Sequence, residues 1–201
     1  MPGKRRPEEE RREGILEAAF RVAARDQLSG LSMRAVAEEA GVSKGLIFFH
    51  FKDKETLLHA LLDWLLETSP RVEVPSDAAG EGLPPGRRLL RVLRHQIAVL
   101  PKRKNRVELF LDFWVMGTGV PEIQEKIHRA FKRYRGEFLP FTQPVVDSLP
   151  GRFEGEDGEG LAATIVSFIQ GCALQLLSDP TGFDVERYMG AIRALVVFEN
   201  T

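Results

Sequence analysis

The sequence predicts an all-α protein of about nine helices. Apolar residues recur at the three- and four-residue spacing of a helix over almost every segment. Alternation of apolar and polar residues, which would indicate a strand, does not extend beyond a few positions, and residues 72–74 come nearest to it. Segments rich in Gly and Pro at 70–86 and 150–160 interrupt the helical pattern and predict loops.

The composition is that of an ordinary globular protein. Of the 201 residues, 43% are hydrophobic and 28% are charged, which excludes a disordered or collagen-like chain. No run approaches the roughly 18 consecutive apolar residues of a membrane helix, and no apolar stretch follows the early cations as in a secretory signal. Cys172 is the only cysteine, so an intrachain disulfide or a Cys-based zinc site is excluded. We expect a cytoplasmic protein with no membrane segment, metal or cofactor.

Each expected helix has an apolar stripe and a recognisable end. Helices are expected over residues 8–26, 33–40, 53–67, 87–100, 103–117, 161–178 and 184–198, with a short one after Ser43 and another from Pro121 onward. Pro140 and Pro144 should kink or split the helix that begins at Pro121. The helix over 161–178 is apolar nearly all round, which predicts burial on several sides.

The segment from residue 32 to residue 54 has the signals of two short helices in succession. Ser32 is a good N-cap, and Gly41 suits the left-handed turn that ends the first helix. Ser43 caps the second helix. Two short helices joined by a glycine turn are typical of a helix-turn-helix, whose second helix enters the major groove of DNA. We expect the unpaired amides at the helix starts of Ser32, Ser43 and Asp53 to face phosphates.

A denser pattern covers this segment and its flanks. It is formed by Ala37, Gly41, Val42, Ser43, Gly45, Phe51, Lys54, Glu55 and Leu57. The pattern resembles the DNA-binding domain of the TetR family, which reads Ala…Ala-Gly-Val-Ser-x-Gly-x-(Leu/Ile)-Tyr-x-His-Phe…Lys-Glu-x-Leu, and residues 12–65 follow it without a gap. Beyond them the resemblance is limited to length, helix count and the break at residues 179–184. It implies a DNA-binding domain over 1–54 and a ligand-binding and dimerisation bundle over 55–201.

The resemblance assigns DNA contacts position by position. The implied residues are Ser32, Arg34, Ser43, Lys44, Gly45, Leu46, Phe48, Phe49, His50 and Lys54. Lys44, Gly45 and Leu46 would lie at base edges or the nearest phosphates, and Phe49 and His50 would end the recognition helix against the DNA backbone. Phe48 departs from the family, which usually has Tyr there, and it cannot donate a hydroxyl to a phosphate.

Plainer interpretations stand beside these assignments. Ala37, Val42, Ile47 and Phe51 are expected in the core, with no contact to DNA. His50 has the alternative role of a surface or capping histidine. The cations at residues 4–6 would either enter the minor groove as an arm or remain solvated.

A homodimer is expected because one small head reads only a few base pairs, whereas a two-fold dimer reads a palindrome. In the family the last two helices form a four-helix bundle with those of a second subunit. The interface residues implied here are Ile165, Ile169, Leu176, Tyr188, Ile192 and Leu195. The alternative is that both helices are internal core.

The resemblance also implies an effector pocket, whose occupation moves the DNA-binding heads apart. The candidate lining is His95, Arg106, Phe110, Phe113, Trp114, Phe131, Tyr134, Phe138, Phe168 and Cys172. Residues 87–135 carry a net charge of +9, between segments of net negative charge. Cations around an apolar cavity would suit a long-chain fatty acid or acyl-CoA. The alternative is a solvated basic surface, with the aromatic residues in the core.

Other classes of function fit the sequence less well. The single Glu-x-x-His pair, Glu125 to His128, falls short of the two pairs of a di-iron bundle, and no nucleophile elbow or phosphate-binding loop occurs, so we expect no enzyme. A lipid carrier would leave the segment 32–54 unexplained. A regulator of multidrug or aromatic-compound response, acting as repressor or activator, is the main alternative.

Overall fold

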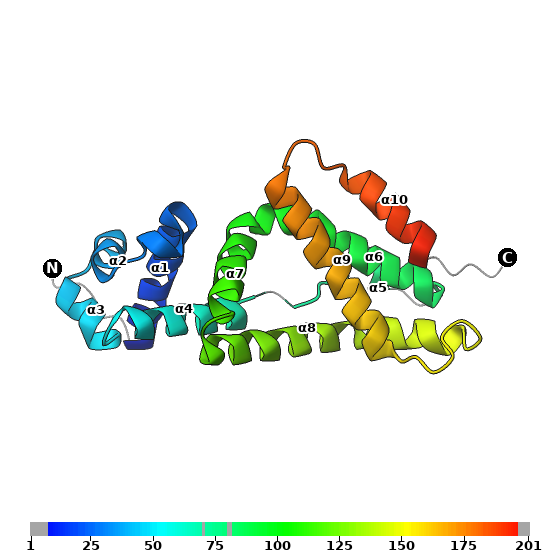
Figure 1. Ribbon diagram of the computed structural model, residues 1–201, viewed down its shortest axis with the longest axis horizontal. Helices are drawn as coiled ribbons and strands as arrows, with labels where there is room; N and C mark the ends of the chain where they lie inside the picture. The colour runs from blue at the N-terminus through cyan, green and yellow to red at the C-terminus, as the bar shows by residue number, and fades with distance from the viewer. Residues whose placement is uncertain (1–7, 70, 80–81, 197–201) are drawn as a thin grey trace. The chain divides into compact units, whose positions relative to one another are not determined.

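The computed structural model describes residues 8–69, 71–79 and 82–196, and it confirms the all-α prediction. In these residues the chain forms ten α-helices, one 3-10 helix and no strand. The helices are α1 (Glu8–Gly30), α2 (Met33–Ala40), α3 (Lys44–His50), α4 (Lys54–Glu67), α5 (Ser76–Ala79), α6 (Pro85–Ala98), η1 (Leu100–Arg103), α7 (Lys104–Gly117), α8 (Pro121–Ser148), α9 (Gly158–Ser178) and α10 (Val185–Val196) (Figure 1).

The prediction that Pro140 and Pro144 split the helix is wrong, because α8 continues through both prolines to Ser148, and the alternative of a kink stays a prediction. Each proline removes one backbone donor from the helix. Both lie on the exposed side, whereas Phe138 and Val145 on the other side are fully buried. Burial of this apolar face stabilises the helix against the loss.

The described chain divides into two compact units. The first contains residues 8–69 and 105–127, and the second contains residues 71–104 and 128–196. In the first unit α1 packs against α2 and α4, and α2 packs against α3. The division by function at residue 54, expected from the sequence, remains a prediction.

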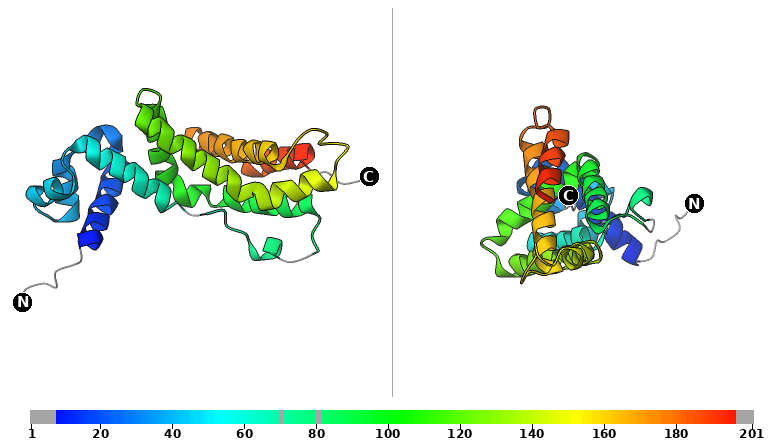
Figure 2. Two further views of the ribbon diagram at one scale, coloured as in Figure 1. Left: turned by 90° about the horizontal axis from the view of Figure 1, so that it is seen from below. Right: turned by 90° about the vertical axis from the view of Figure 1, so that its right-hand side faces the viewer.

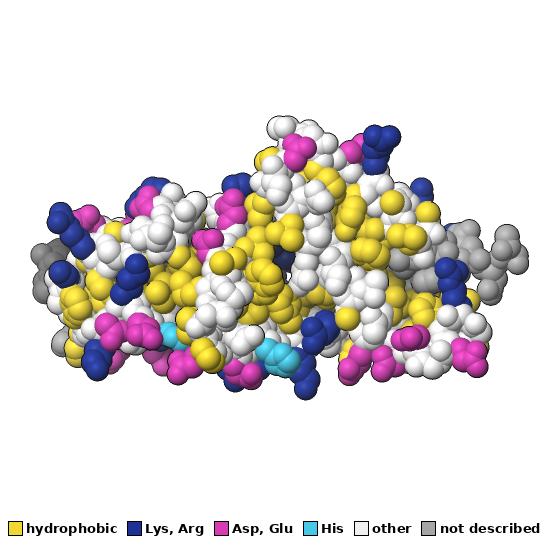
Figure 3. Space-filling view, in the orientation of Figure 1, with side chains coloured by type: hydrophobic (Ala, Val, Ile, Leu, Met, Phe, Trp, Pro, Cys, Tyr) yellow, Lys and Arg dark blue, Asp and Glu magenta, His cyan; other side chains and the backbone are white. Residues whose placement is uncertain are grey.

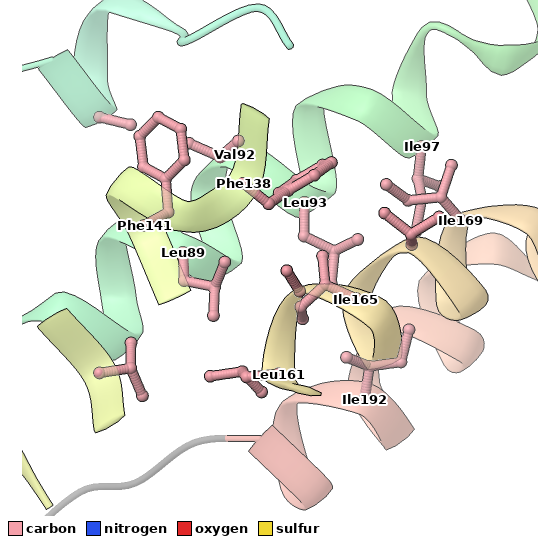
Figure 4. Packing of buried hydrophobic residues seen from close by; sticks show 14 of the residues in the cluster. Leu89, Val92, Leu93, Ile97, Phe138, Phe141, Leu161, Ile165, Ile169 and Ile192 are labelled. Carbon is pink, nitrogen blue, oxygen red and sulfur yellow. The ribbon is translucent and has the colours of Figure 1, made fainter. Parts of the chain in front are cut away.

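The second unit has a continuous apolar core between α6, α8, α9 and α10 (Figure 4). Figure 4 shows Leu93 and Ile97 of α6 beside Ile165 and Ile169 of α9, with Ile192 of α10 on the far side. All five side chains are buried. Burial of each side chain stabilises the fold by about 1.5–3 kcal/mol relative to an exposed position. Because α9 packs against both α6 and α10, it is buried on several sides, as its apolar sequence predicts.

The expectation that no segment is apolar enough to cross a membrane needs a correction at α9. By length and composition alone, Gly158–Ser178 qualifies as a membrane span. Core helices of soluble proteins meet the same criterion, and Leu161, Ile165, Val166 and Ile169 of α9 are buried against neighbouring helices. We therefore interpret α9 as a core helix.

Within the second unit, side-chain hydrogen bonds join the segment 71–79 to α6 and η1, although the sequence predicts only a loop there. Figure 2 shows this segment as an extended stretch that carries the short α5. Oε2 of Glu73 lies 3.0 Å from Nε2 of His95, and Arg103 donates to Oε1 over 2.6 Å. Gln96 donates to the Glu73 carbonyl over 2.9 Å. The bond with His95 and the charge of Arg103 hold the pKa of the Glu73 carboxyl below its ordinary value.

Candidate nucleic-acid interface

Two serines start the helices of the helix-turn-helix, as the sequence predicts. The hydroxyl of Ser32 accepts from the amide of Ala35 over 3.1 Å, and the hydroxyl of Ser43 accepts from the amide of Leu46 over 3.2 Å. Each bond satisfies one otherwise unpaired donor in the first turn. Both serines are exposed, so they stay accessible to a molecule that approaches the head.

Asp53 caps α4 in the same way. Its Oδ1 accepts from the amide of Thr56 over 2.8 Å and from the hydroxyl of Thr56 over 2.7 Å. These hydrogen bonds hold the pKa of the Asp53 carboxyl below its ordinary value, and the bond from the backbone amide of Thr56 has the largest effect. The cap leaves Lys54 exposed at the first position of α4.

A glycine turn sets the angle between α2 and α3. Gly41 has a φ of 65°, which is left-handed and favours glycine. Its N–H donates to Glu38 over 3.2 Å, and the N–H of Val42 donates to Ala37 over 3.0 Å. These two hydrogen bonds form a Schellman cap, which satisfies backbone carbonyls at the carboxyl end of α2.

The inner face of α3 is anchored in the core of the first unit. Ile47 and Phe51 are almost completely buried, as expected from the sequence. The guanidinium of Arg12 lies 5.3 Å from the centre of the Phe51 ring. The sequence analysis did not predict a role for Arg12. This anchoring fixes which side of α3 faces outward.

The outer face of α3 consists of Lys44, Gly45, Phe48 and Phe49, all of them exposed. Phe48 and Phe49 expose 46% and 72% of their area. Nζ of Lys44 lies 5.6 Å from the centre of the Phe48 ring, which is cation–π distance. The TetR-family pattern usually has a tyrosine at this position. Phe48 has no hydroxyl to offer a phosphate, and its ring instead contacts the ammonium of Lys44.

The remaining candidate residues of the head are placed less uniformly. Leu46 is half-buried. Nε of Arg34 bonds Oε1 of Glu38 over 2.8 Å in an exposed ion pair, which raises the pKa of Arg34. A phosphate would have to compete with Glu38 for this guanidinium. The cations at residues 4–6 lie outside the described residues.

His50 lies between two aromatic rings at the end of α3. Its ring centre is 5.2 Å from that of Phe49 and 6.3 Å from that of Phe51. Its Nε2 is buried and has no hydrogen-bond partner within the part of the chain that the structure describes. The ring thus packs the end of the recognition helix, and its contact with DNA remains a prediction.

An exposed charge network joins α1 to α2. Nε of Arg21 lies 2.8 Å from Oε1 of Glu39, and a guanidinium nitrogen of Arg25 lies 3.0 Å from Oε2. The hydrogen bonds from Arg21 and Arg25 hold the pKa of Glu39 below its ordinary value. The network positions α2 relative to the long first helix.

The ten residues predicted to line an effector pocket fall in both compact units. Arg106, Phe110, Phe113 and Trp114 belong to the first, and His95, Phe131, Tyr134, Phe138, Phe168 and Cys172 belong to the second. Phe113, Phe138 and Cys172 are fully buried in the packed interior, whereas Trp114 exposes 50% of its area. The lining therefore remains a prediction.

Arg106 of α7 is engaged by α1 and α4. It donates over 2.8 Å to the carbonyl of Leu65 and to the hydroxyl of Thr68, at the carboxyl end of α4. Its guanidinium also lies 5.8 Å from the centre of the Phe20 ring and 5.4 Å from that of Trp64. This residue connects three helices of the first unit, which sequence reasoning missed.

Burial changes the chemistry of two further candidates in the second unit. It raises the pKa of Tyr134 to about 12 and that of the Cys172 thiol to about 11. The thiolate of Cys172 is therefore scarce at neutral pH, so the thiol is expected to be chemically inert. Tyr134 packs edge-on against Phe138, with ring centres 5.4 Å apart.

Much of the basic segment 87–135 is paired within the chain. The pairs include Arg88 with the Ala78 carbonyl, Arg91 with Asp77, Arg94 with Glu186, Arg103 with Glu73, Arg106 with Leu65 and Thr68, and Lys126 with Asp63. These cations stabilise the protein's own helices and loops. The net charge of the segment overstates the cations available to an anionic effector.

The six predicted dimerisation residues differ in burial: three are buried, Leu176 and Tyr188 are half-buried, and Leu195 is exposed. Ile165, Ile169 and Ile192 are buried in the core of the protomer itself, which fits the internal-core alternative for these three. Leu195 exposes 65% of its area. Tyr188 is half-buried and donates from Oη to the carbonyl of Phe168 over 2.7 Å, joining α10 to α9. Hydrophobic side chains nevertheless reach the surface over α9 and α10 (Figure 3).

The capped helices, the left-handed glycine turn and the exposed outer face of α3 define a DNA-binding protein of the helix-turn-helix class. Residues 15–61 match the model of "Bacterial regulatory proteins, tetR family". Residues 85–197 match that of "BetI-type transcriptional repressor, C-terminal". The chain belongs to the tetR family of transcriptional regulators.

Relatives and solved structures agree over nearly the whole chain. The HTH-type transcriptional regulator TtgR of Pseudomonas putida is 30% identical over 182 residues, which cover 88% of this chain and 85% of the relative. The multidrug binding protein EbrR, solved with imidazole, is 26% identical with a TM-score of 0.64, over 98% of this chain and 99% of that one. A TetR transcription regulator from Haloarcula marismortui has a TM-score of 0.73 at 19% identity, over 94% and 97% of the two chains.

Proposed function

We propose that this ligand-responsive tetR-family regulator binds a palindromic operator in the cytoplasm as a homodimer and represses transcription until an effector releases it. The observation that carries the proposal is the outer face of α3, where Lys44, Gly45, Phe48 and Phe49 are exposed on a helix anchored from behind by Ile47. Such a face is free to enter a major groove without unpacking the head.

The dimer is supported by the exposed side of the last two helices. Leu174 of α9 and Leu195 of α10 expose 50% and 65% of their areas, and small residues such as Ala191 and Ala194 lie exposed near Leu195 in sequence. Apolar side chains and small residues permit close packing against a second copy. The proposed interface therefore uses this outer side, with Leu176 and Tyr188 half-buried at its edge.

The effector we propose is a small hydrophobic or amphipathic molecule. A long-chain fatty acid or acyl-CoA is the first candidate, because Lys132 and Arg135 add positive charge to α8, a helix rich in aromatic residues. The pairing of six other cations within the chain lowers the number that would meet an acidic head group. An uncharged aromatic or drug-like compound is the second candidate, favoured by the multidrug-binding relative EbrR.

The operator test uses the full-length chain and a pool of random DNA duplexes. Repeated selection for bound duplexes is expected to yield a palindrome with half-sites about one helical turn apart. Lys44→Ala should weaken binding about uniformly across sequences and reduce its salt dependence. A chain that selects no duplex above background, or that sediments as a monomer with its operator, would overturn the proposal.

The effector test adds dodecanoyl-CoA, dodecanoic acid or a panel of drug-like aromatic compounds to the operator complex. A true effector should lower operator affinity by about 5- to 150-fold and raise the melting temperature of the free protein. If the aromatic panel acts and the acyl compounds do not, the second candidate replaces the first. Transcript levels after gene deletion distinguish repression from activation.

A further inference from the structure

The four outward residues of α3 form one continuous face. At 3.6 residues per turn, positions 44, 45, 48 and 49 lie within an arc of about 140°, and all four are exposed. Two of them are phenylalanines, with 46% and 72% of their areas accessible. The part of the head that faces DNA in the proposed function is therefore largely apolar.

Gly45 lies between the two rings in angle around the helix. A Cβ built there would meet nothing closer than the Ser43 hydroxyl, at 3.9 Å, and the residue is not in a left-handed conformation. Neither packing within the described chain nor backbone torsion requires a glycine at this position. The missing side chain instead gives an outside molecule access to the helix backbone, flanked by Phe48 and Phe49.

The major groove offers one apolar group at the base edges, the 5-methyl group of thymine, and phenylalanine is among the side chains that contact it. We propose that Phe48 and Phe49 are specificity-determining residues that bind thymine methyl groups in each operator half-site. The bare backbone at Gly45 lets the base edges come close enough for both contacts. This inference rests on the proposed function, and it adds the base that the recognition helix selects.

The test removes the methyl group without changing base pairing. In the selected operator, each dT of a half-site is replaced in turn by dU, and affinity is measured with the full-length protein at fixed salt. We expect dU to lower affinity about fourfold at each contacted position, the effect of removing one buried methyl group. With Phe48→Ala or Phe49→Ala, the operator is bound more weakly, and the dT and dU forms at the corresponding position are bound equally.

Two controls separate base reading from general effects. Val115 of α7 is exposed to 62%, comparably to the two phenylalanines, and Val115→Ala should leave both affinity and the dU effect unchanged. Lys54→Ala, at an exposed position on α4, should weaken the dT and dU operators by the same factor. Melting temperatures of the Phe variants should stay near that of the parent chain, because both rings are exposed.

The outcomes are distinguishable. A selected operator that is bound equally with dU at every position leaves the DNA-binding function in place and overturns the inference. A dU effect that persists unchanged in both Phe variants also overturns it. A pool from which no duplex is selected overturns the proposed function and this inference together.

Discussion

At the scale of single residues, Gly45 is expected to lower the stability of α3 and to favour DNA binding. Glycine is a poor helix former, and the Cβ space at this position is open within the chain. We therefore infer that the glycine serves the approach of DNA to the helix backbone. The same reasoning distinguishes it from Gly41, whose left-handed φ of 65° serves the fold.

Gly45→Ala is expected to change stability and DNA binding in opposite directions. The free energy of unfolding should rise by up to about 1 kcal/mol from helix propensity. Operator affinity should fall about tenfold or more, a loss of at least about 1.4 kcal/mol, because a methyl group obstructs the base edges. Urea unfolding and fluorescence anisotropy with labelled operator measure the two effects. Gly14→Ala is the control, because a Cβ at that position of α1 would meet no atom within 4 Å, and it should leave affinity unchanged. Equal affinity for Gly45→Ala would contradict the role assigned to that residue.

Glu73 gives the second unit a predictable response to acid. Its pKa is depressed by the bond with His95 and by the charge of Arg103, so its ionised form favours the folded state. This contribution is complete above about pH 4.3, the ordinary glutamate value, and is lost as pH falls through the lower native pKa. Urea midpoints of the parent chain should therefore decline more steeply below that pH than those of Glu73→Gln. Parallel curves for the two proteins would exclude a stabilising role for this carboxylate.

Residue-scale prediction from the sequence succeeded where the interaction is local. The caps of Ser32 and Ser43 involve partners three positions along the chain, and the Gly41 turn follows from residue type. The contacts of Glu73 with His95 and of Arg106 with Leu65 join positions separated by 22 and 41 residues. No spacing rule within one helix identifies such pairs, because they depend on how helices and loops pack.

At the scale of elements, α8 shows that tertiary packing can override a local signal. The prolines predict a kink or a split, and the split does not occur, because the buried face of α8 carries Phe138 and Val145 into the core of the second unit. A proline costs a helix interior about 3 kcal/mol relative to alanine. Core burial of a few large side chains is of the same order or larger, and the periodic pattern alone does not reveal how much area they bury.

Pro144→Ala is expected to stabilise the protein, because the new N–H can bond the carbonyl of Pro140 in an unbroken helix. The gain should be about 1–3 kcal/mol in the free energy of unfolding, measured by urea titration. Pro121→Ala is the matched control at the start of the same helix, where proline is well tolerated, and it should be near neutral. A destabilised Pro144→Ala would mean that the ring itself is required.

The first unit depends on Arg106 as the connection of α7 to α1 and α4. Arg106→Ala removes the bonds to Leu65 and Thr68 and the stacking on Phe20 and Trp64, and it should destabilise the unit by about 1–3 kcal/mol. Arg106→Lys keeps the charge but loses the planar guanidinium, so it should recover only part of the loss. In a Trp114→Phe background, Trp64 is the remaining tryptophan, and its fluorescence follows this contact during unfolding. Identical curves for all three proteins would contradict the assignment.

At the scale of the whole molecule, the sequence predicted the helix count closely and the family correctly. It placed the faces of α9 less well, because an almost wholly apolar helix gives no polar side from which to infer orientation, and it assigned the buried Ile192 of α10 to the interface. Ile165 and Ile169 point into the protomer, and Leu174 and Leu195 lie outside. Only the packed structure separates the two sets.

The outward leucines are expected to control assembly. Leu174→Glu combined with Leu195→Glu should yield a monomer at micromolar concentration in sedimentation velocity, because charge is placed at the proposed interface. Affinity for the palindrome should fall about 100-fold or more as the two heads lose their linkage. Val115→Glu, an equally exposed position on α7, should remain dimeric. A double variant that still sediments as a dimer would place the interface elsewhere.

The discontinuous first unit has a practical consequence for anyone who wishes to express the DNA-reading part alone. Residues 8–69 share their fold with 105–127, which the gene encodes some 35 codons later. A stop codon after position 69 would discard α7 and the guanidinium that covers Phe20 and Trp64, exposing two aromatic rings to water. A soluble fragment would need that missing helix supplied again, for example by a short linker that joins residue 69 directly to residue 105.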